Sequence, residues 1–225
     1  MINFPEPICR LLRLEPGSIT NIYGGPGTGK TNICLLLSVR CVKNGKDVFY
    51  MDTENGFSLE RLKQVEPDNW QTCLEKIKLA QPKDLREQGD IIKSMEGNFG
   101  LIVIDSMVAL YRLYYSERTH NDDLVMQANR ELSKQLSILA NIAREKKIPV
   151  IVTAHAYRSW ETKEWDAIGG EILKYWSKAI LFLERTGKTS ERMATLMKHP
   201  YLPEHKNVKF EIVQTGIKPV GFKIF

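Results

Sequence analysis

Residues 24–31 read Gly24-Gly25-Pro26-Gly27-Thr28-Gly29-Lys30-Thr31, a complete match to the G-x-x-x-x-G-K-[ST] pattern of a phosphate-binding loop. Its glycines allow consecutive backbone N–H groups to point at a phosphate, and the following helix adds the partial positive charge of its N-terminus. We expect Lys30 to reach the β- and γ-phosphates and the Thr31 hydroxyl to bind Mg²⁺. The whole loop, with Asn32, is therefore predicted to bind ATP.

The segments on either side of the loop have the pattern that such a loop requires. Residues 18–23 alternate like a short strand, and residues 33–42 form an apolar helical run that ends at Asn44-Gly45. The alternative is a chance glycine-rich turn, which this strand and helix make the weaker interpretation.

The composition of the chain is that of a globular protein. It has 225 residues, of which 43% are hydrophobic and 26% charged, enough to bury a large core. No apolar run could span a bilayer and no signal-peptide pattern opens the chain, so we expect a cytoplasmic protein with no membrane partner. The four cysteines form no C-x-x-C pair and are expected to be buried thiols. The net charge of +5 permits a polyanionic partner without requiring one.

Strand-like and helical segments alternate along most of the chain. The expected strands are residues 18–23, 47–52, 101–105 and 148–154, and the clearest helix covers residues 125–147. This alternation predicts an α/β fold with a mainly parallel central sheet flanked by helices. Residues 180–184, 192–197 and 208–213 predict a C-terminal antiparallel β-meander. We expect a single domain over residues 1–225.

Two further strand ends supply acidic side chains. Residues 101–105 form a fully apolar strand that ends in Asp105, the position from which a carboxylate helps to hold Mg²⁺. The next residue is Ser106 rather than a glutamate, so the catalytic base must come from another segment. Glu54 follows the strand at residues 47–52 and lies at the same predicted edge. We predict that Glu54 is the base and that Asp52 has a structural role; the alternative for Glu54 is an acid that stabilises a helix start.

His155 follows the strand at residues 148–154, again at the edge where ligands bind in open α/β sheets. A polar side chain there could sense the γ-phosphate of ATP. The alternative is an ordinary surface histidine at a strand end.

In their order and spacing, these motifs resemble the ATPase core of the RecA/RadA recombinase family. The resemblance rests on residues 24–31, 50–54 with 57–62, 101–106, 148–155, 168–170 and 199–204. It implies a RecA-like P-loop ATPase core that uses ATP and Mg²⁺, with Lys30 and Glu54 as catalytic residues. It also implies that Arg61 packs against adenine, and that Pro203 caps ATP bound to a neighbouring subunit of a homo-oligomer.

The sequence departs from the family pattern at two positions. One domain of the full-length recombinases is also not expected in it. His155 stands where the recombinases have glutamine, and Tyr175 stands where archaeal and eukaryotic members have histidine. Both positions belong to the relay that couples DNA to hydrolysis, so we expect weak ATPase activity, either dependent on DNA or independent of it. Because about 23 residues precede the loop, we expect no N-terminal helical DNA-binding domain, as in core-only archaeal paralogues.

The DNA-binding loops of the family correspond to residues 111–123 and 156–167. Cationic side chains would neutralise phosphates there, and aromatic rings would stack on unpaired bases. The side chains predicted to bind DNA, preferably single-stranded, are Tyr157, Arg158, Trp160, Lys163 and Arg112. The same mixture of residues also suits a protein interface.

The function that the resemblance implies is assistance to homologous recombination and DNA repair. Two alternatives remain open at this stage. One is a nucleotide-switched adaptor that recruits a RadA-type recombinase or a junction-resolving nuclease. The other is a KaiC-like signalling ATPase that does not bind DNA.

Overall fold

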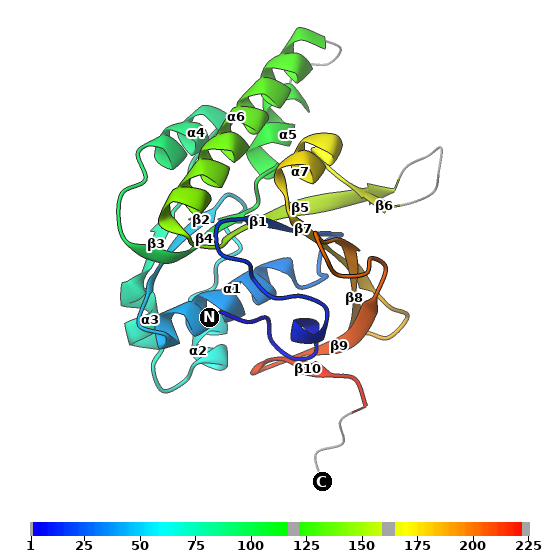
Figure 1. Cartoon of the computed structure of the whole chain (residues 1–225). Helices are drawn as coiled ribbons and strands as arrows, with labels where there is room; N and C mark the ends of the chain where they lie inside the picture. Colours follow the sequence, from blue (N-terminus) through cyan, green and yellow to red (C-terminus); the bar gives the residue numbers. More distant parts are fainter. Residues whose placement is uncertain (1, 117–121, 159–164, 222–225) are drawn as a thin grey trace.

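A twisted central sheet with helices on both faces forms the protein (Figure 1). The computed structural model describes residues 2–116, 122–158 and 165–221. The strands are β1 (Ile19–Gly24), β2 (Asp47–Asp52), β3 (Ile77–Ala80), β4 (Phe99–Asp105), β5 (Val150–Arg158), β6 (Trp165–Ala167), β7 (Ala179–Arg185), β8 (Glu191–Lys198), β9 (Asn207–Val213) and β10 (Gly216–Pro219).

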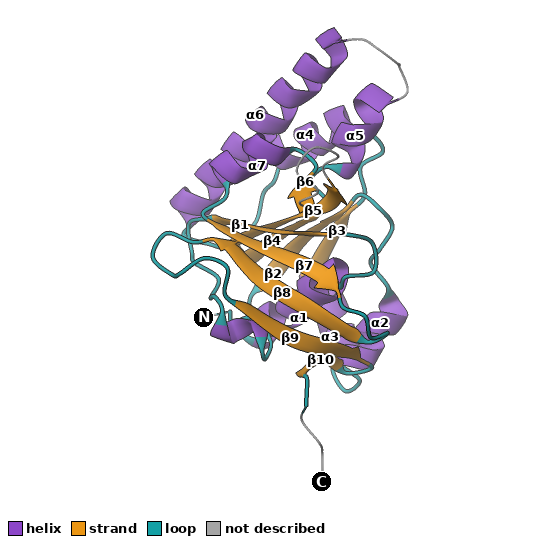
Figure 2. Cartoon of the chain, turned by 90° about the vertical axis from the view of Figure 1, so that its right-hand side faces the viewer, coloured by secondary structure: helices purple, strands orange, loops and turns teal. Residues whose placement is uncertain are grey.

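The sheet has the strand order β10-β9-β8-β7-β1-β5-β4-β2-β3, with β6 paired to β5 outside this path. In the part of this order that reads β7-β1-β5-β4-β2-β3, each strand runs parallel to its neighbours. The strands β7, β8, β9 and β10 pair antiparallel in succession. Figure 2 shows this antiparallel part curving around α1. These observations confirm the predicted α/β fold with a C-terminal β-meander.

Helices cover both faces because the parallel strands are apolar on both faces. The helices are η1 (Ile8–Arg10), α1 (Lys30–Lys43), α2 (Leu59–Val65), α3 (Trp70–Lys76), α4 (Leu85–Lys93), α5 (Ala109–Ser116), α6 (Asp122–Lys146) and α7 (Gly170–Trp176). Figure 1 shows α1, α2 and α3 on one side of the sheet and α4, α5, α6 and α7 on the other. One core cluster therefore includes Ile33 and Leu37 of α1, and the other includes Leu132 and Leu136 of α6.

Two predicted strand assignments need correction. The strand predicted at residues 148–154 continues to Arg158, because β6 pairs with residues 156–158 and satisfies their backbone hydrogen bonds. His155 therefore lies within β5 rather than after it. The first strand of the predicted meander, β7, also belongs to the parallel part of the sheet, because it pairs with β1.

The prediction of a loop from residue 111 was wrong. Residues 109–116 form α5, which buries Leu110 and Tyr111 against the core and hydrogen-bonds the Tyr111 hydroxyl to Asn129 of α6. The apolar packing of one face explains why this aromatic-rich segment is helical. Residues 117–121 of the predicted loop lie outside the described residues.

Three of the four cysteines are buried, as the sequence predicts. Cys34, Cys41 and Cys73 are buried free thiols, and Cys9 is partly exposed. Within the described ranges, none of the helices combines the length and apolar character needed to cross a membrane.

Candidate nucleotide-binding site

The predicted site residues meet at the carboxyl edge of the parallel strands. Register pairing places Asp52 opposite Asp105, and Gly24 opposite His155. Since β1 lies between β5 and β7 in the sheet, the loop that follows Gly24 starts at the centre of this edge. The structure thus brings together side chains from four separate chain segments.

The conformation of the loop depends on its glycines. A Cβ atom at Gly24 would lie 2.3 Å from the carbonyl oxygen of Leu183, so no side chain fits there. Gly27 and Gly29 have φ values of 69° and 102°, which glycine adopts without strain. The space around a Cβ at Gly25 or Gly27 is open. The loop therefore leaves open space beside Gly25 and Gly27, where a phosphate could be held.

Lys30 is folded over this loop. Its Nζ donates hydrogen bonds to the carbonyl oxygens of Gly24 and Gly25, at 2.8 and 3.0 Å. Burial lowers the pKa of Lys30, while the carboxylates of Glu54 and Asp105 oppose this effect. The ammonium is therefore pre-positioned among backbone carbonyls and within the field of two acids.

Asp105 is held rigidly at the end of β4. Its Oδ1 accepts a hydrogen bond from Thr153 at 2.6 Å, and its Oδ2 accepts one from Tyr50 at 2.9 Å. Burial raises the pKa of this carboxyl, and hydrogen bonds from Thr153, Thr31 and Tyr50 oppose the rise. The hydroxyl of Thr31 and the carboxylate of Asp105 are the hard oxygen donors that suit Mg²⁺.

Glu54 and His155 form a direct pair. His155 Nε2 lies 2.7 Å from Glu54 Oε1. This hydrogen bond is the largest cause that lowers the pKa of Glu54, and the charge of Lys30 acts in the same direction. Glu54 therefore has a defined partner, and the two predicted site residues are joined rather than independent.

Asp52 has the structural role that the sequence predicts. Its carboxylate accepts hydrogen bonds from the backbone N–H groups of Glu54, Gly56 and Phe57, at 3.2, 3.0 and 2.9 Å. These bonds fix the turn that carries Glu54 beyond the end of β2.

Arg61 joins α2 to α1 and to the β9–β10 turn. Its Nε donates to Asn32 Oδ1 at 2.9 Å, and its Nη2 donates to the carbonyl oxygen of Val213 at 2.8 Å. Arg61 borders a cavity of about 240 Å³ next to the phosphate-binding loop. Thr31, Asn32 and Phe57 also line this cavity, so it lies where the predicted adenine contact would fall.

Arg192 is a site residue that the sequence did not reveal. It lies on β8, is buried, and donates from Nε to the carbonyl oxygen of Gly27 at 2.9 Å. The contact spans 165 residues of sequence, and no local motif accompanies it. Only the pairing of β8 with β7 places this side chain beside the loop.

Tyr175 and Pro203, which the family resemblance singles out, lie at the opposite, amino edge of the sheet, where the parallel strands begin. Tyr175 is 78% exposed and lines a cavity with Gly17 and Ser18, which precede β1. Pro203 is exposed and follows β8, whose last residue pairs with Ile180 near the start of β7. Neither residue can reach the phosphate-binding loop of its own chain.

The predicted DNA-binding residues are divided among three groups. Tyr157 and Arg158 lie on β5 where it pairs with β6. Arg112 lies on α5 and lines a cavity of about 550 Å³ together with Tyr157. Trp160 and Lys163 lie outside the described residues.

The sheet order, the phosphate-binding loop and the acids at one strand edge define a RecA-like P-loop fold. The sequence model of the Rad51 family matches residues 11–220, and this chain belongs to that family, in its RadB branch.

Curated relatives and a solved structure agree with this assignment. A protein of Methanobrevibacter smithii named "DNA repair and recombination protein RadB" is 39% identical over 214 residues, which cover 91% of this chain and 88% of the relative. A protein of the same name from Methanococcus maripaludis is 40% identical, and the match covers 92% and 94% of the two chains. The crystal structure of a RadB recombinase has a TM-score of 0.79 at 31% identity, covering 98% of this chain and all of that one.

The contact between Glu54 and His155 gives a testable pH dependence. Because the pKa of Glu54 is lowered in the folded protein, its stabilising contribution is present above the unfolded value near 4.5 and is lost as the pH falls through the folded pKa. We expect His155→Ala to raise the pKa of Glu54 towards its ordinary value, as measured by NMR titration of the side-chain carboxyl. The difference in free energy of unfolding between the parental protein and His155→Ala should shrink as the pH falls below the folded pKa of Glu54.

His155→Gln is the matched control, because an amide N–H can replace the imidazole donor. This variant should keep the pKa of Glu54 low. An unchanged pKa of Glu54 in the alanine variant would show that the pair has no electrostatic consequence.

Proposed function

We propose that this protein is a DNA repair and recombination protein that binds MgATP at residues 24–31, hydrolyses it slowly and binds single-stranded DNA. The observation that carries this proposal is the convergence of Lys30, Asp105 and Glu54 at one strand edge, beside a glycine cradle. The names of the relatives from the two methanogens support the biological role.

Each site residue has a distinct part in this proposal. Lys30 and the backbone N–H groups of the loop bind the phosphates, and Thr31 and Asp105 hold Mg²⁺. The bound Mg²⁺ would neutralise charge on the phosphate oxygens. Glu54 accepts the proton of the attacking water, and Arg61 contacts the adenine. Arg192 holds the carbonyl of Gly27 and so keeps the loop in its binding conformation.

Slow hydrolysis follows from the environment of Glu54. A carboxylate whose pKa is lowered is a weaker general base, and one of the two oxygens of Glu54, Oε1, is engaged by His155. Release of Oε1 by His155 would make both oxygens of the carboxylate available to the attacking water.

DNA binding is proposed for the hairpin of β5 and β6 with the neighbouring α5. Tyr157 and Arg112 face one cavity, so an aromatic ring and a cation are available together for an unpaired strand. The exposed positions of Tyr175 and Pro203 at the amino edge support a homo-oligomer in which one copy completes the nucleotide site of the next.

The pairing of Glu54 with His155 also favours a second candidate function. If the pair holds the site inactive, ATP would set the conformation of an adaptor that recruits a RadA-type recombinase or a junction-resolving nuclease. A KaiC-like signalling role has less support, because the curated relatives above carry recombination names.

ATPase measurements with and without single-stranded DNA, at several salt concentrations, test the proposed function. We expect slow turnover with ATP bound tightly, and DNA binding that weakens as salt increases. Tight ATP binding without turnover in either condition would favour the adaptor. Absence of DNA binding at physiological salt would contradict the proposal.

Glu54→Gln separates ATP binding from hydrolysis. The amide keeps the size of the side chain but cannot accept a proton, so we expect ATP affinity to be retained and turnover to fall by about 10²- to 10⁴-fold. Glu75→Gln, an exposed acid on α3, is the matched control and should hydrolyse ATP normally. Turnover of Glu54→Gln at the parental rate would rule out Glu54 as the base.

The double variant Arg158→Ala with Lys163→Ala tests the DNA contact. Removing two phosphate contacts should weaken binding to single-stranded DNA and reduce the slope of log affinity against log salt by about 1.4. Lys78→Ala with Lys83→Ala removes two exposed charges near the edge strand β3 and should change neither quantity. If the first double variant also leaves both unchanged, this hairpin does not bind DNA.

A further inference from the structure

Ser106 is a buried side chain beside the proposed base, and it has no part in the function proposed above. It follows the last residue of β4 and is 0% exposed. Its Oγ accepts hydrogen bonds from the backbone N–H groups of Val108 and Ala109, at 3.4 and 3.1 Å. Ala109 is the first residue of α5, so the hydroxyl satisfies an N–H group that has no partner within the helix.

These two hydrogen bonds from the start of α5 direct the hydroxyl hydrogen of Ser106. A hydroxyl offers two acceptor lone pairs and one donor, and the two N–H groups occupy the lone pairs. The O–H is then left to donate to Glu54. The hydrogen bond from His155 is the largest cause that lowers the pKa of Glu54, and a hydrogen bond from Ser106 lowers it further. The start of α5 therefore fixes the direction in which Ser106 holds the carboxylate.

Thr53 fixes the backbone of Ser106. Its Oγ1 donates to the carbonyl oxygen of Ser106 at 2.8 Å and accepts a hydrogen bond from the Ser106 N–H at 2.9 Å. Its own backbone N–H donates to the carbonyl oxygen of Asp105 at 2.9 Å. Since Thr53 directly precedes Glu54, these hydrogen bonds tie the turn that carries the base to the end of β4.

The segment from Ser106 to α5 is also held in the core. Met107 is fully buried, and its backbone N–H donates to the carbonyl oxygen of Thr153 of β5 at 2.9 Å. Ala109 lines a cavity of about 400 Å³ together with His155, so the start of α5 lies beside the other partner of the base. A supporting segment that is packed and hydrogen-bonded can hold a side chain in one orientation.

We propose that Ser106 is a positioning residue for Glu54, and that Thr53 holds Ser106 in the place that this requires. The residue after Asp105 thus does not replace the missing adjacent base but orients the base supplied by the turn after β2. A carboxylate held by two donors, His155 and Ser106, has fewer orientations than a carboxylate held by one. The proposal rests on the proposed function, because it needs Glu54 to be the base.

Steady-state ATP hydrolysis tests the direction of the effect. Ser106→Ala removes the hydroxyl and should lower kcat by about tenfold with KM for ATP unchanged, because a displaced catalytic group loses rate rather than substrate binding. Loss of the Ser106 donor should also raise the pKa of Glu54 and make it a stronger base. A kcat that rises or stays the same would therefore show that Ser106 does not position Glu54, and would overturn the proposal.

Combination with Glu54→Gln separates positioning from a general structural role. If Ser106 acts through Glu54, adding Ser106→Ala should not slow Glu54→Gln any further. A further loss of about tenfold in the double variant overturns the proposal, since capping of α5 would then explain the effect. If Glu54→Gln itself turns over at the parental rate, the proposed base fails instead, so the two failures are distinguishable.

Thr53 provides a second pair of variants, which carries the test if Ser106→Ala does not fold. Thr53→Val removes the hydroxyl with little change in shape and should lower kcat, whereas Thr53→Ser keeps the hydroxyl and should restore it. In the nucleotide-free protein, hydrogen exchange of the Ala109 N–H should become about fivefold faster in Thr53→Val, because its acceptor Ser106 is less firmly held. If either quantity is unchanged in Thr53→Val, the proposal is overturned.

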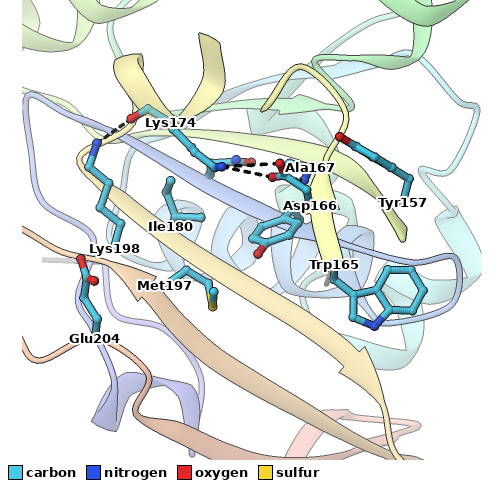
Figure 3. Close-up of a pocket in the computed structure, with 11 residues that line it drawn as sticks. Tyr157, Trp165, Asp166, Ala167, Lys174, Ile180, Met197, Lys198 and Glu204 are labelled. Atoms are coloured by element: carbon cyan, nitrogen blue, oxygen red, sulfur yellow. Dashed lines mark hydrogen bonds and ion pairs between the residues drawn. The ribbon is translucent and has the colours of Figure 1, made fainter. Parts of the chain in front are cut away.

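Met197→Ala is the control for loss of stability alone. Figure 3 shows Met197 beside Ile180 in a cavity of about 590 Å³ on the face of β1, β7 and β8. Among the described residues, none from α5 or from the turn after β2 lines this cavity. Met197 packs against a core cluster, so its truncation should destabilise the protein and leave kcat unchanged. Circular dichroism establishes that each variant is folded.

Discussion

The close approach of Gly24 to Leu183 is the constraint on which the rest of the structure depends. β1 lies between two parallel neighbours, and its last residue has no room for a side chain because a carbonyl oxygen occupies that space. The chain can then turn sharply into the loop, so that α1 begins at Lys30 directly beside the ends of β2 and β4. The glycine thus fixes both the packing of the sheet and the position of the ammonium group.

The acids around this loop are distinguished by their environments. Asp105 is buried and satisfied by two hydroxyl donors, which suits a fixed ligand. Asp52 accepts hydrogen bonds from three backbone N–H groups and so stabilises the turn after β2. Glu54 is more exposed and pairs with His155. Three carboxylates at one sheet edge therefore have three different environments, and their hydrogen bonds rather than their residue types distinguish them.

Local sequence patterns were sufficient to predict the parallel strands, the loop and the positions of the acids at the strand ends. Motif spacing and apolar runs can be recognised within short stretches of sequence. Arg192 could not be assigned, since its importance comes from Gly27, which strand order brings beside it. Residues 111–116 were misread as part of a loop because a DNA-binding loop of the family corresponds to residues 111–123, whereas the packing against α6 makes them helical. The pair of Glu54 with His155 also needed the fold, since 101 residues separate them.

The continuity of β5 has a mechanical consequence. His155 contacts Glu54, and two residues further along the same strand Tyr157 enters the hairpin with β6, with no break in backbone pairing between them. Residues two apart on a strand point to the same face of the sheet, so the side chains of His155 and Tyr157 lie on one face of β5. A shift of β5 that moves the His155 imidazole away from Glu54 would therefore also shift the residues that pair with β6, so the nucleotide site and the hairpin share one structural element.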